Sequence, residues 1–178
     1  MLTVFITAIL CIGIDQLTKY LVVSNFAVGE SIGLIDGVFH FTYIKNEGAA
    51  FGSLSDYRWI FMSASILLII GIIVYSVWKR PKNIFLCLSL GMLLGGGVGN
   101  MIDRIFLGYV VDFLDFCAFP ELWKWIFNFA DAFVCVGTAL LIFWMFKYDT
   151  KTYDAEKTAE KTDGAESVKG GNENDEAE

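Results

Sequence analysis

Long apolar runs constrain this chain more strongly than any other feature of its sequence. Residues 59–78, 84–102 and 126–146 are each close to the ~20 residues that an α-helix needs to cross a hydrocarbon layer ~30 Å thick, and the first run contains no charged side chain. Residues 2–23 form a fourth run, interrupted by one acid and one lysine, which we interpret as a retained helix rather than a signal peptide. The sequence therefore predicts an all-α membrane protein with four transmembrane helices over these ranges.

The composition agrees with a membrane protein and separates one acidic segment from the rest. Hydrophobic residues make up 56% of the 178 residues and the mean hydropathy is +0.57, which is more than a soluble core of this size requires. Residues 149–178 carry ten acids and four lysines, which accounts for −6 of the formal charge of −7. We expect residues 1–148 to form the folded domain and 149–178 to be a disordered cytoplasmic tail.

Basic residues in the short connections predict the orientation of the helices. WKRPKN, residues 78–83, joins the second and third runs, and Lys147 follows the fourth. Because Lys and Arg favour the cytoplasmic side, these two connections and both termini are expected in the cytoplasm. Residues 24–58 and 103–125 are then the outer segments.

The first outer segment contains a hairpin signal. In SIGLIDGVFHFTYI, Asp36-Gly37 separates two short runs, and Phe39, Phe41 and Tyr43 alternate with the residues between them. Asp-Gly accepts the positive φ that a type I′ turn requires. A small extracytoplasmic β-sheet is therefore expected between the first and second helices.

Cysteine and histidine usage gives no framework for a disulfide or a metal site. Cys11, Cys87, Cys117 and Cys135 lack CxxC spacing, and three of the four lie within apolar runs. His40 is the only histidine, so a Ser-His-Asp triad or an HExxH zinc site lacks parts. We expect no bound metal and no cofactor.

Glycines in the third run indicate helix packing rather than nucleotide binding. GMLLGGGVGN contains neither GxGxxG after a strand nor GxxxxGK[ST]. Gly91, Gly95 and Gly99 recur every four residues. This spacing predicts a close helix contact in lipid.

Ionisable and amide side chains at the ends of the apolar runs are the strongest functional signal. A charged group at membrane depth costs ~2.5–3.5 kcal/mol on insertion scales, so each requires a partner, a cavity or a function. The residues that gather toward the outer ends are Asp15, Lys19, Asn100, Asp103, Arg104, Asp112, Asn128 and Asp131. Structural ion pairs that fix helix register, such as Asp15 with Lys19 and Asp103 with Arg104 or another basic group, remain an alternative at this point.

Asp112 and Asp131 fit the ion-pair interpretation poorly. Both are flanked by apolar residues, and neither has a basic residue three or four positions away. If the outer ends of the third and fourth helices meet, the two carboxyls share one proton, because like charges in a low-dielectric site cannot both ionise easily. One carboxylate then activates water while the protonated partner polarises a scissile carbonyl, which is the arrangement of an aspartic protease.

Five short motifs occur in order along the apolar part of the chain. They are DQLTKY (15–20), KNEGAAFG (45–52), GNMIDR (99–104), VVDF (110–113) and FNFADAF (127–133). This ordered set resembles the lipoprotein signal peptidases, or signal peptidase II, over residues 1 to about 148. The resemblance implies a four-span bacterial membrane aspartic endopeptidase with an outer sheet. It also implies a short outer helix between the third and fourth spans, for which FLDFCAFPELWKW (113–125) is the candidate.

The resemblance also implies a substrate and a set of site residues. Its members remove the signal peptide of a prolipoprotein by cutting before a diacylglyceryl-modified cysteine, so the expected partners are such prolipoproteins and membrane lipid, without nucleic acid. By motif match Asp112 and Asp131 are the catalytic pair. The positions that line the site or orient the pair are Asp15, Asn46, Asn100, Arg104 and Asn128. Asp103 resembles a structural partner, and Asp115 lies outside the motif. We expect a monomer in the bacterial cytoplasmic membrane, with the site at the outer face.

Two other classes of function remain open. A proton- or ion-coupled carrier would use Asp15, Lys19, Asp112 and Asp131 as a relay, but a relay needs ionisable groups at several depths, and the second run has none. A non-enzymatic membrane assembly factor predicts no dependence on a pair of aspartates. Cleavage of a lipidated prolipoprotein distinguishes these classes.

Overall fold

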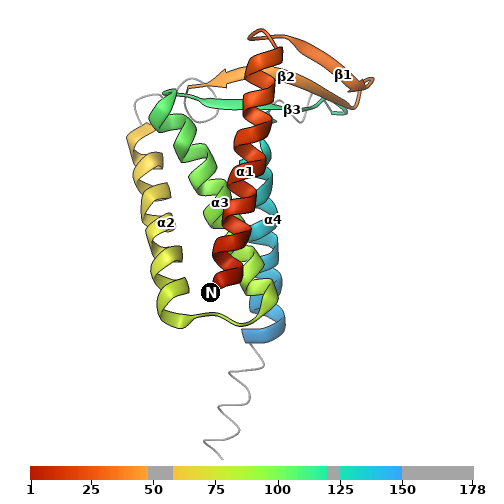
Figure 1. The fold of residues 1–178 in the computed structure, drawn as a ribbon. Helices are drawn as coiled ribbons and strands as arrows, with labels where there is room; N and C mark the ends of the chain where they lie inside the picture. Colours follow the sequence, from red (N-terminus) through yellow and green to blue (C-terminus); the bar gives the residue numbers. More distant parts are fainter. Residues whose placement is uncertain (48–57, 120–124, 150–178) are drawn as a thin grey trace, which may run out of the picture. The chain divides into compact units, whose positions relative to one another are not determined.

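The described part of the chain, residues 1–47, 58–119 and 125–149 of a computed structural model, is mostly helical (Figure 1). Its helices are α1 Leu2–Asn25, α2 Arg58–Lys79, α3 Ile84–Phe106 and α4 Phe129–Trp144, and a π-helical turn, Met145–Asp149, follows α4. Among these described residues four helices are long and apolar enough to cross a membrane, as predicted. The chain divides into two compact units, Met1–Leu140 and Leu141–Glu178. The predicted tail lies outside the described residues apart from its first residue, so its disorder stays a prediction.

Two differences between the observed and the predicted helix ends move polar residues of the site. α3 continues to Phe106 instead of ending at residue 102, which places Asp103 and Arg104 inside the helix. α4 begins at Phe129 rather than at 126, because Ile126–Phe127 pairs as a strand. The polar residues near the end of α3 therefore share one rigid helix with Asn100.

The buried face of α1 includes polar residues, whereas its exposed face is apolar. Its buried residues recur every three or four positions: Val4, Ala8, Cys11, Asp15, Lys19 and Val22. Its exposed residues include Leu2, Ile6, Ile9, Leu10, Leu17 and Leu21. A helix at the surface of a soluble protein shows the reverse pattern. This distribution suits a helix whose outer face contacts lipid tails and whose inner face belongs to a functional site.

α1 and α3 lie in close contact through glycines. Cβ atoms added at Gly91 and Gly95 would lie 2.5 and 2.6 Å from side chains of α1, and one at Gly99 would lie 2.6 Å from Asp15 Oδ2. The predicted close helix contact of these three glycines is therefore confirmed, and its partner is α1. The contact brings Asp15 and Lys19 against the end of α3 that carries the polar residues.

α4 packs against α3 through glycines of both helices. A Cβ added at Gly96 would collide with the backbone carbonyl oxygen of Ala130, and one at Gly137 would lie 3.1 Å from that of Ser89. Ala130 is fully buried. These contacts hold the first turn of α4, which carries Asp131, beside α3.

A four-stranded antiparallel sheet within the described residues lies at the end of the helices where α1 ends (Figure 1). Its strands are β1 Ser31–Ile35, β2 Phe39–Asn46, β3 Val110–Phe116 and β4 Ile126–Phe127, paired in that order. The predicted sheet is confirmed for β1 and β2, and β3 and β4 extend it from the segment between α3 and α4. Ile44 pairs with Asp112 across β2 and β3.

The predicted outer helix over residues 113–125 is wrong where the structure describes it. Residues up to Phe116 belong to β3, residues 117–119 are not helical, and 120–124 lie outside the described residues. The sequence VVDFLDF is rich in β-branched and aromatic residues, and pairing with β2 satisfies its backbone groups. Asp112 is therefore held by a strand and not by the end of a helix.

The turn between β1 and β2 lies at the predicted Asp36-Gly37 but has a different geometry. Ile35 pairs with Phe39 across residues 36–38, and the Val38 amide donates to the Ile35 carbonyl at 3.0 Å. Gly37 has φ of +67°, whereas Asp36 has no positive φ. A type I′ turn needs positive φ at both central positions, so the predicted turn type is wrong.

An aromatic core joins the sheet to the helices. Its buried members are Val22, Tyr43, Val111, Phe113 and Leu114. The ring centroid of Phe113 lies 6.0 Å from that of Phe129, at the start of α4, and 6.2 Å from that of Phe41 on β2. This core fixes β3, and with it Asp112, against α1 and α4.

Candidate active site

The polar residues identified from the sequence gather where the helices meet the sheet. Asp15 and Lys19 come from α1, Asn46 from β2, Asn100 and Arg104 from α3, Asp112 from β3, and Asn128 and Asp131 from the start of α4. Asp15 and Asn128 are 0% exposed, and Asp112 is 1% exposed. Buried polar groups of this kind must find their partners inside the protein.

A buried lysine neutralises carboxylates of α1 and α3. Lys19 Nζ lies 2.9 Å from Asp15 Oδ2 and 2.9 Å from Asp103 Oδ2. The same ammonium donates to Asn100 Oδ1 at 3.0 Å, so its three donors have three acceptors. Gln16 Nε2 donates to Asp103 Oδ1 at 2.9 Å. The predicted pair of Asp15 and Lys19 is confirmed as part of this larger ion network.

Of the two options that the sequence left open for Asp103, Arg104 or another basic group, the structure selects the second, because Asp103 pairs with Lys19. Arg104 donates through Nη1 to the Asn100 carbonyl at 3.2 Å, and among the described residues it has no carboxylate partner. Arg104 is adjacent to Asp103 in the sequence, but the side chains of neighbouring residues point to different sides of a helix. The guanidinium of Arg104 is half-buried and retains further donors.

Both carboxylates of the ion network hold the backbone beside the predicted catalytic pair. Asp103 Oδ2 accepts from the Val111 amide at 3.0 Å, and Asp15 Oδ1 accepts from the Ala130 amide at 2.9 Å. Val111 directly precedes one aspartate of the pair, and Ala130 directly precedes the other. Hydrogen bonds to a carboxylate are roughly twice as strong as neutral ones. The network therefore fixes the strand and the helix turn that carry the pair.

Asp112 is buried in β3 with both of its oxygens engaged. Asn46 Nδ2 donates to Oδ2 at 2.8 Å, and Asn128 Nδ2 donates to Oδ1 at 2.6 Å. Burial, together with the charge of Asp131, raises the pKa of Asp112 to about 7, although the two amides oppose this change. Asp112 is therefore a carboxyl that can hold a proton near neutral pH.

Asp131 is held by a reciprocal cap at the N-terminus of α4. Its amide donates to Asn128 Oδ1 at 3.0 Å, and the Asn128 amide donates back to Asp131 Oδ2 at 3.2 Å. This is the geometry of a capping box, with Asn and Asp at the two positions. The other carboxylate oxygen accepts from Asn100 Nδ2 at 2.7 Å. Asp131 is half-buried, so it is more accessible than Asp112.

Asn128 connects the two aspartates into one network. Its side-chain nitrogen donates to Asp112, and its side-chain oxygen accepts from the backbone of Asp131. The same nitrogen lies 3.0 Å from Asn100 Oδ1, which also accepts from Lys19. The structure thus joins all the predicted site residues through hydrogen bonds. Arg104 joins through a backbone carbonyl only.

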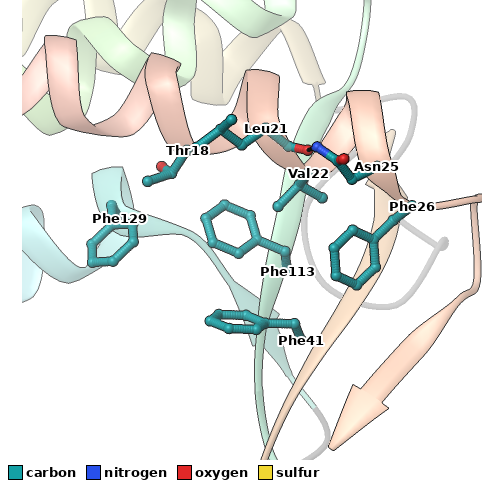
Figure 2. A pocket seen from close by; sticks show the side chains of 8 residues that line it. All are labelled: Thr18, Leu21, Val22, Asn25, Phe26, Phe41, Phe113 and Phe129. Carbon is teal, nitrogen blue, oxygen red and sulfur yellow. Dashed lines mark hydrogen bonds between the residues drawn. The ribbon is translucent and has the colours of Figure 1, made fainter. Parts of the chain in front are cut away.

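Two apolar cavities adjoin the network. The first, of about 420 Å³, is lined by Trp125, Phe127, Asp131, Ala132, Cys135 and Val136. The second, of about 390 Å³, is lined by Thr18, Leu21, Val22, Asn25, Phe26, Phe41, Phe113 and Phe129. Figure 2 shows the phenyl rings of the second cavity facing the last turns of α1. Both volumes are in the range of small-ligand pockets, and among the described residues Asp131 is the only carboxyl that lines either one.

The sequence analysis missed several of these roles. It did not assign Lys19 as the shared partner of two carboxylates, and it gave Gln16 no role. It also left Trp125 and Phe127 without a place in the site. One signal was readable: Asn128-x-x-Asp131 at the start of an apolar run has capping-box spacing.

Known sequences similar to this chain indicate its family. The family described as "Signal peptidase (SPase) II" matches residues 7–147. A lipoprotein signal peptidase of Desulfitobacterium hafniense (strain DSM 10664 / DCB-2) is 44% identical over 149 residues, covering 83% of this chain and 95% of that protein. One of Clostridioides difficile (strain 630) is 41% identical over 145 residues, covering 81% of this chain and 95% of that protein.

Solved structures of bacterial membrane enzymes also resemble this chain. A bacterial membrane enzyme structure determined by the in meso method at 2.3 Å resolution has a TM-score of 0.75 at 30% identity, covering 85% of this chain and 92% of that one. A second, at 1.9 Å resolution, has a TM-score of 0.74 at 31% identity, covering 83% and 95%. The fold is therefore that of a membrane enzyme. Because the family match spans most of the chain and the relatives are more than 40% identical, the chain belongs to the signal peptidase II family.

Proposed function

We propose that this chain is a membrane aspartic endopeptidase that removes signal peptides from bacterial prolipoproteins, cutting before the diacylglyceryl-modified cysteine. The observation that carries the mechanism is the linkage of two carboxyls, Asp112 and Asp131, through Asn128 at the edge of an apolar pocket. Membership of the signal peptidase II family, whose relatives are named lipoprotein signal peptidases, supports the substrate.

The two carboxyls lie in different environments. Asp112 is buried, and its raised pKa of about 7 supports its role as the protonated partner that polarises the scissile carbonyl. Asp131 lies at the positive end of the α4 dipole and lines the pocket, so it acts as the carboxylate that activates water. The scissile bond reaches the pair from the side of Asp131, because Asp112 is only 1% exposed.

The surrounding residues orient the pair and bind the substrate backbone. Asn46, Asn100 and Asn128 each donate to an aspartate oxygen, which fixes the carboxyl planes. Asp15 acts through the Ala130 amide and is a positioning residue. We assign Arg104 to a substrate carbonyl, because its guanidinium has donors beyond its one helix bond.

The lipid on the substrate explains the place of the site. Acyl chains attached to a cysteine stay in the bilayer, so the peptide bond next to them is presented at the membrane surface. The polar network lies at one end of the spanning helices, and the two apolar cavities beside it offer space for an aliphatic chain. By the basic residues of WKRPKN this end is the outer face. One chain carries both aspartates, so we propose a monomer that needs no cofactor.

The test is cleavage of a purified lipidated prolipoprotein by wild-type protein, Asp112→Asn and Asp131→Asn in detergent. Each variant should lose at least about 10²-fold in rate, since an amide keeps the size of the side chain but cannot transfer the proton. Glu30→Gln, which changes an exposed carboxyl that within the described residues accepts only from the Ala27 amide, is the matched control. Near-wild-type cleavage by either aspartate variant, with normal thermal unfolding, would refute the dyad.

The same precursor without its diacylglyceryl group tests the substrate assignment. Each buried CH₂ contributes ~0.8 kcal/mol, so loss of the acyl chains should make cleavage very slow while the peptide bond is unchanged. Equal cleavage of both precursors would refute the lipoprotein assignment and leave an aspartic protease. Cleavage of neither, with proton flux in liposomes, would favour a carrier.

A further inference from the structure

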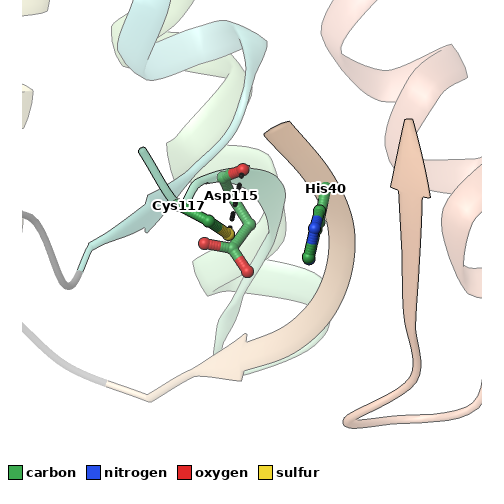
Figure 3. Close-up of side chains that lie close together, drawn as sticks. All are labelled: His40, Asp115 and Cys117. Atoms are coloured by element: carbon green, nitrogen blue, oxygen red, sulfur yellow. Dashed lines mark hydrogen bonds between the residues drawn. The ribbon is translucent and has the colours of Figure 1, made fainter. Parts of the chain in front are cut away.

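Three side chains of metal-ligating type, one on β2, one on β3 and one directly after β3, lie together outside the catalytic network. They are His40, Asp115 and Cys117, and their ligand atoms all lie within 4.8 Å of one another (Figure 3). All three are half-buried, so they are shielded in part and still reachable from solvent. None of them contacts the carboxyl pair through a hydrogen bond among the described residues.

The strand pairing accounts for this arrangement. His40 on β2 is the register partner of Asp115 on β3, so their side chains project from the same face of the sheet. Cys117 lies two residues after Asp115 and therefore on the same side of the chain. Its backbone amide donates to the Val38 carbonyl at 2.8 Å, which continues the pairing beyond the last residue of β3.

We propose that His40, Asp115 and Cys117 form a binding site for a divalent cation of the zinc type, with water as the fourth ligand. Imidazole nitrogen, carboxylate oxygen and thiolate sulfur are the three ligand classes of Zn²⁺ in proteins. Bonds of about 2.0–2.3 Å in a tetrahedron place ligand atoms roughly 3.5 Å apart. Small side-chain rotations are enough to reach that spacing from the present one. Binding releases the thiol proton to solvent, because sulfur ligates as the thiolate.

The surroundings of the three ligands resemble those of a supported metal site. Thr42 Oγ1 donates to Asp115 Oδ2 at 2.7 Å, which orients the carboxylate and leaves Oδ1 for a cation. Ser31 Oγ lies 2.8 Å from Thr42 Oγ1 and extends this support to β1. Within the described residues the ring nitrogens of His40 have no hydrogen-bond partner, so a lone pair is available to a metal.

Gly33 has no side chain, and this leaves room for the imidazole ring of His40. Gly33 is the register partner of His40 on β1, and the ring lies 3.6 Å from the position that a Cβ on Gly33 would occupy. Asp36 Oδ1 lies 3.2 Å from the same position. A carboxylate near the ring of a ligating histidine is the usual acceptor for its second nitrogen. The sequence alone could not predict this site, because its ligands are distant in the chain and follow no spacing motif.

Cobalt and zinc titrations of the purified, detergent-solubilised protein test the site. Co²⁺ should give a sulfur-to-cobalt charge-transfer band and tetrahedral d–d bands that saturate at one equivalent, and Zn²⁺ should displace them. His40→Ala and Cys117→Ser should each weaken Zn²⁺ binding by at least about tenfold. Cys135→Ser, which changes an exposed thiol on α4, should bind as the wild type does. Absence of the sulfur band in the wild type, or its loss only in Cys135→Ser, would overturn the proposal.

Two measurements on the wild type do not depend on folding of the variants. Zinc X-ray absorption should show one sulfur at about 2.3 Å with nitrogen and oxygen at about 2.0–2.2 Å, and a shell without sulfur contradicts the site. Zn²⁺ at a hundred times its Kd should also raise the unfolding temperature, because the ion would tie β2 to β3 only in the folded state. An unfolding temperature unchanged by saturating Zn²⁺ would equally count against it.

Discussion

Replacement of Lys19 by methionine isolates the effect of its charge, because methionine has a similar length and an apolar end. The variant removes one ammonium that lies 2.9 Å from both Asp15 Oδ2 and Asp103 Oδ2. Those carboxylates are 0% and 2% exposed, so water cannot replace the lost partner. Breaking a buried ion pair on one side costs about 3–5 kcal/mol. We expect Lys19→Met to lose stability in this range.

A double variant separates charge from packing. Asp103→Asn keeps a side-chain oxygen that can accept from the Val111 amide but removes one negative charge. If uncompensated charge is the cause, Lys19→Met with Asp103→Asn should be more stable than Lys19→Met alone. Lys82→Met, at an exposed lysine, should stay within about 0.5 kcal/mol of the wild type.

Equilibrium unfolding in mixed micelles, followed by tryptophan fluorescence, measures these differences. The cleavage assay adds a second measurement, because the network holds the amides that precede both catalytic candidates. Activity should fall in the single variant even below its unfolding transition. A loss under about 1 kcal/mol, or a double variant less stable than the single one, would refute the argument that Lys19 neutralises two buried charges.

Three further outcomes follow from the site, the pKa of Asp112 and the orientation. Gly99→Ala places a Cβ 2.6 Å from a carboxylate oxygen of α1 and should cost about 1–3 kcal/mol in unfolding experiments, whereas Gly13→Ala, with nothing within 4 Å, should not destabilise. The pKa of Asp112 in the folded protein, about 7, exceeds its ordinary value of 3.8, so its contribution to stability is present at low pH and is lost as pH rises between these values. The unfolding free energy of Asp112→Asn should therefore lack this decline with pH. Equal slopes of unfolding free energy against pH for the variant and the wild type would contradict the burial argument. In a chain without native cysteines, an impermeant thiol reagent should label Asp36→Cys in intact cells and Lys82→Cys only after permeabilisation, and labelling of the latter in intact cells would reverse the orientation.

The sequence predicted those features that depend on local pattern or on the cost of burial. Apolar length located the four helices, and glycine spacing predicted a close contact of α3, although only the structure identifies α1 as its partner. The burial cost of charged groups marked Asp15 and Lys19, which lie one turn apart on the same helix face. Each of these signals is contained within one helix and can be read without knowledge of the fold.

The missed features depend on contacts between distant segments. β3 was predicted as part of an outer segment and a short helix, yet it pairs with β2, which lies about seventy residues earlier in the chain. The sequence left the partner of Asp103 open between Arg104 and another basic group, and only the approach of α1 selects Lys19. The cluster of His40 with Asp115 depends on the same β2–β3 register.

One carboxyl of the proposed pair lies on a strand and the other at the start of a helix. The proposed mechanism assigns their roles from this difference. Asp131 occupies the first turn of α4, where a helix N-terminus favours negative charge, and the capping box fixes its orientation. Asp112 lies in a buried strand, where loss of water favours the neutral acid. Two carboxyls on one helix face would share one environment. Their surroundings would then not indicate which of the two holds the proton. In the proposed mechanism, placing one carboxyl on a strand and one at a helix terminus separates the acid from the base before any substrate binds.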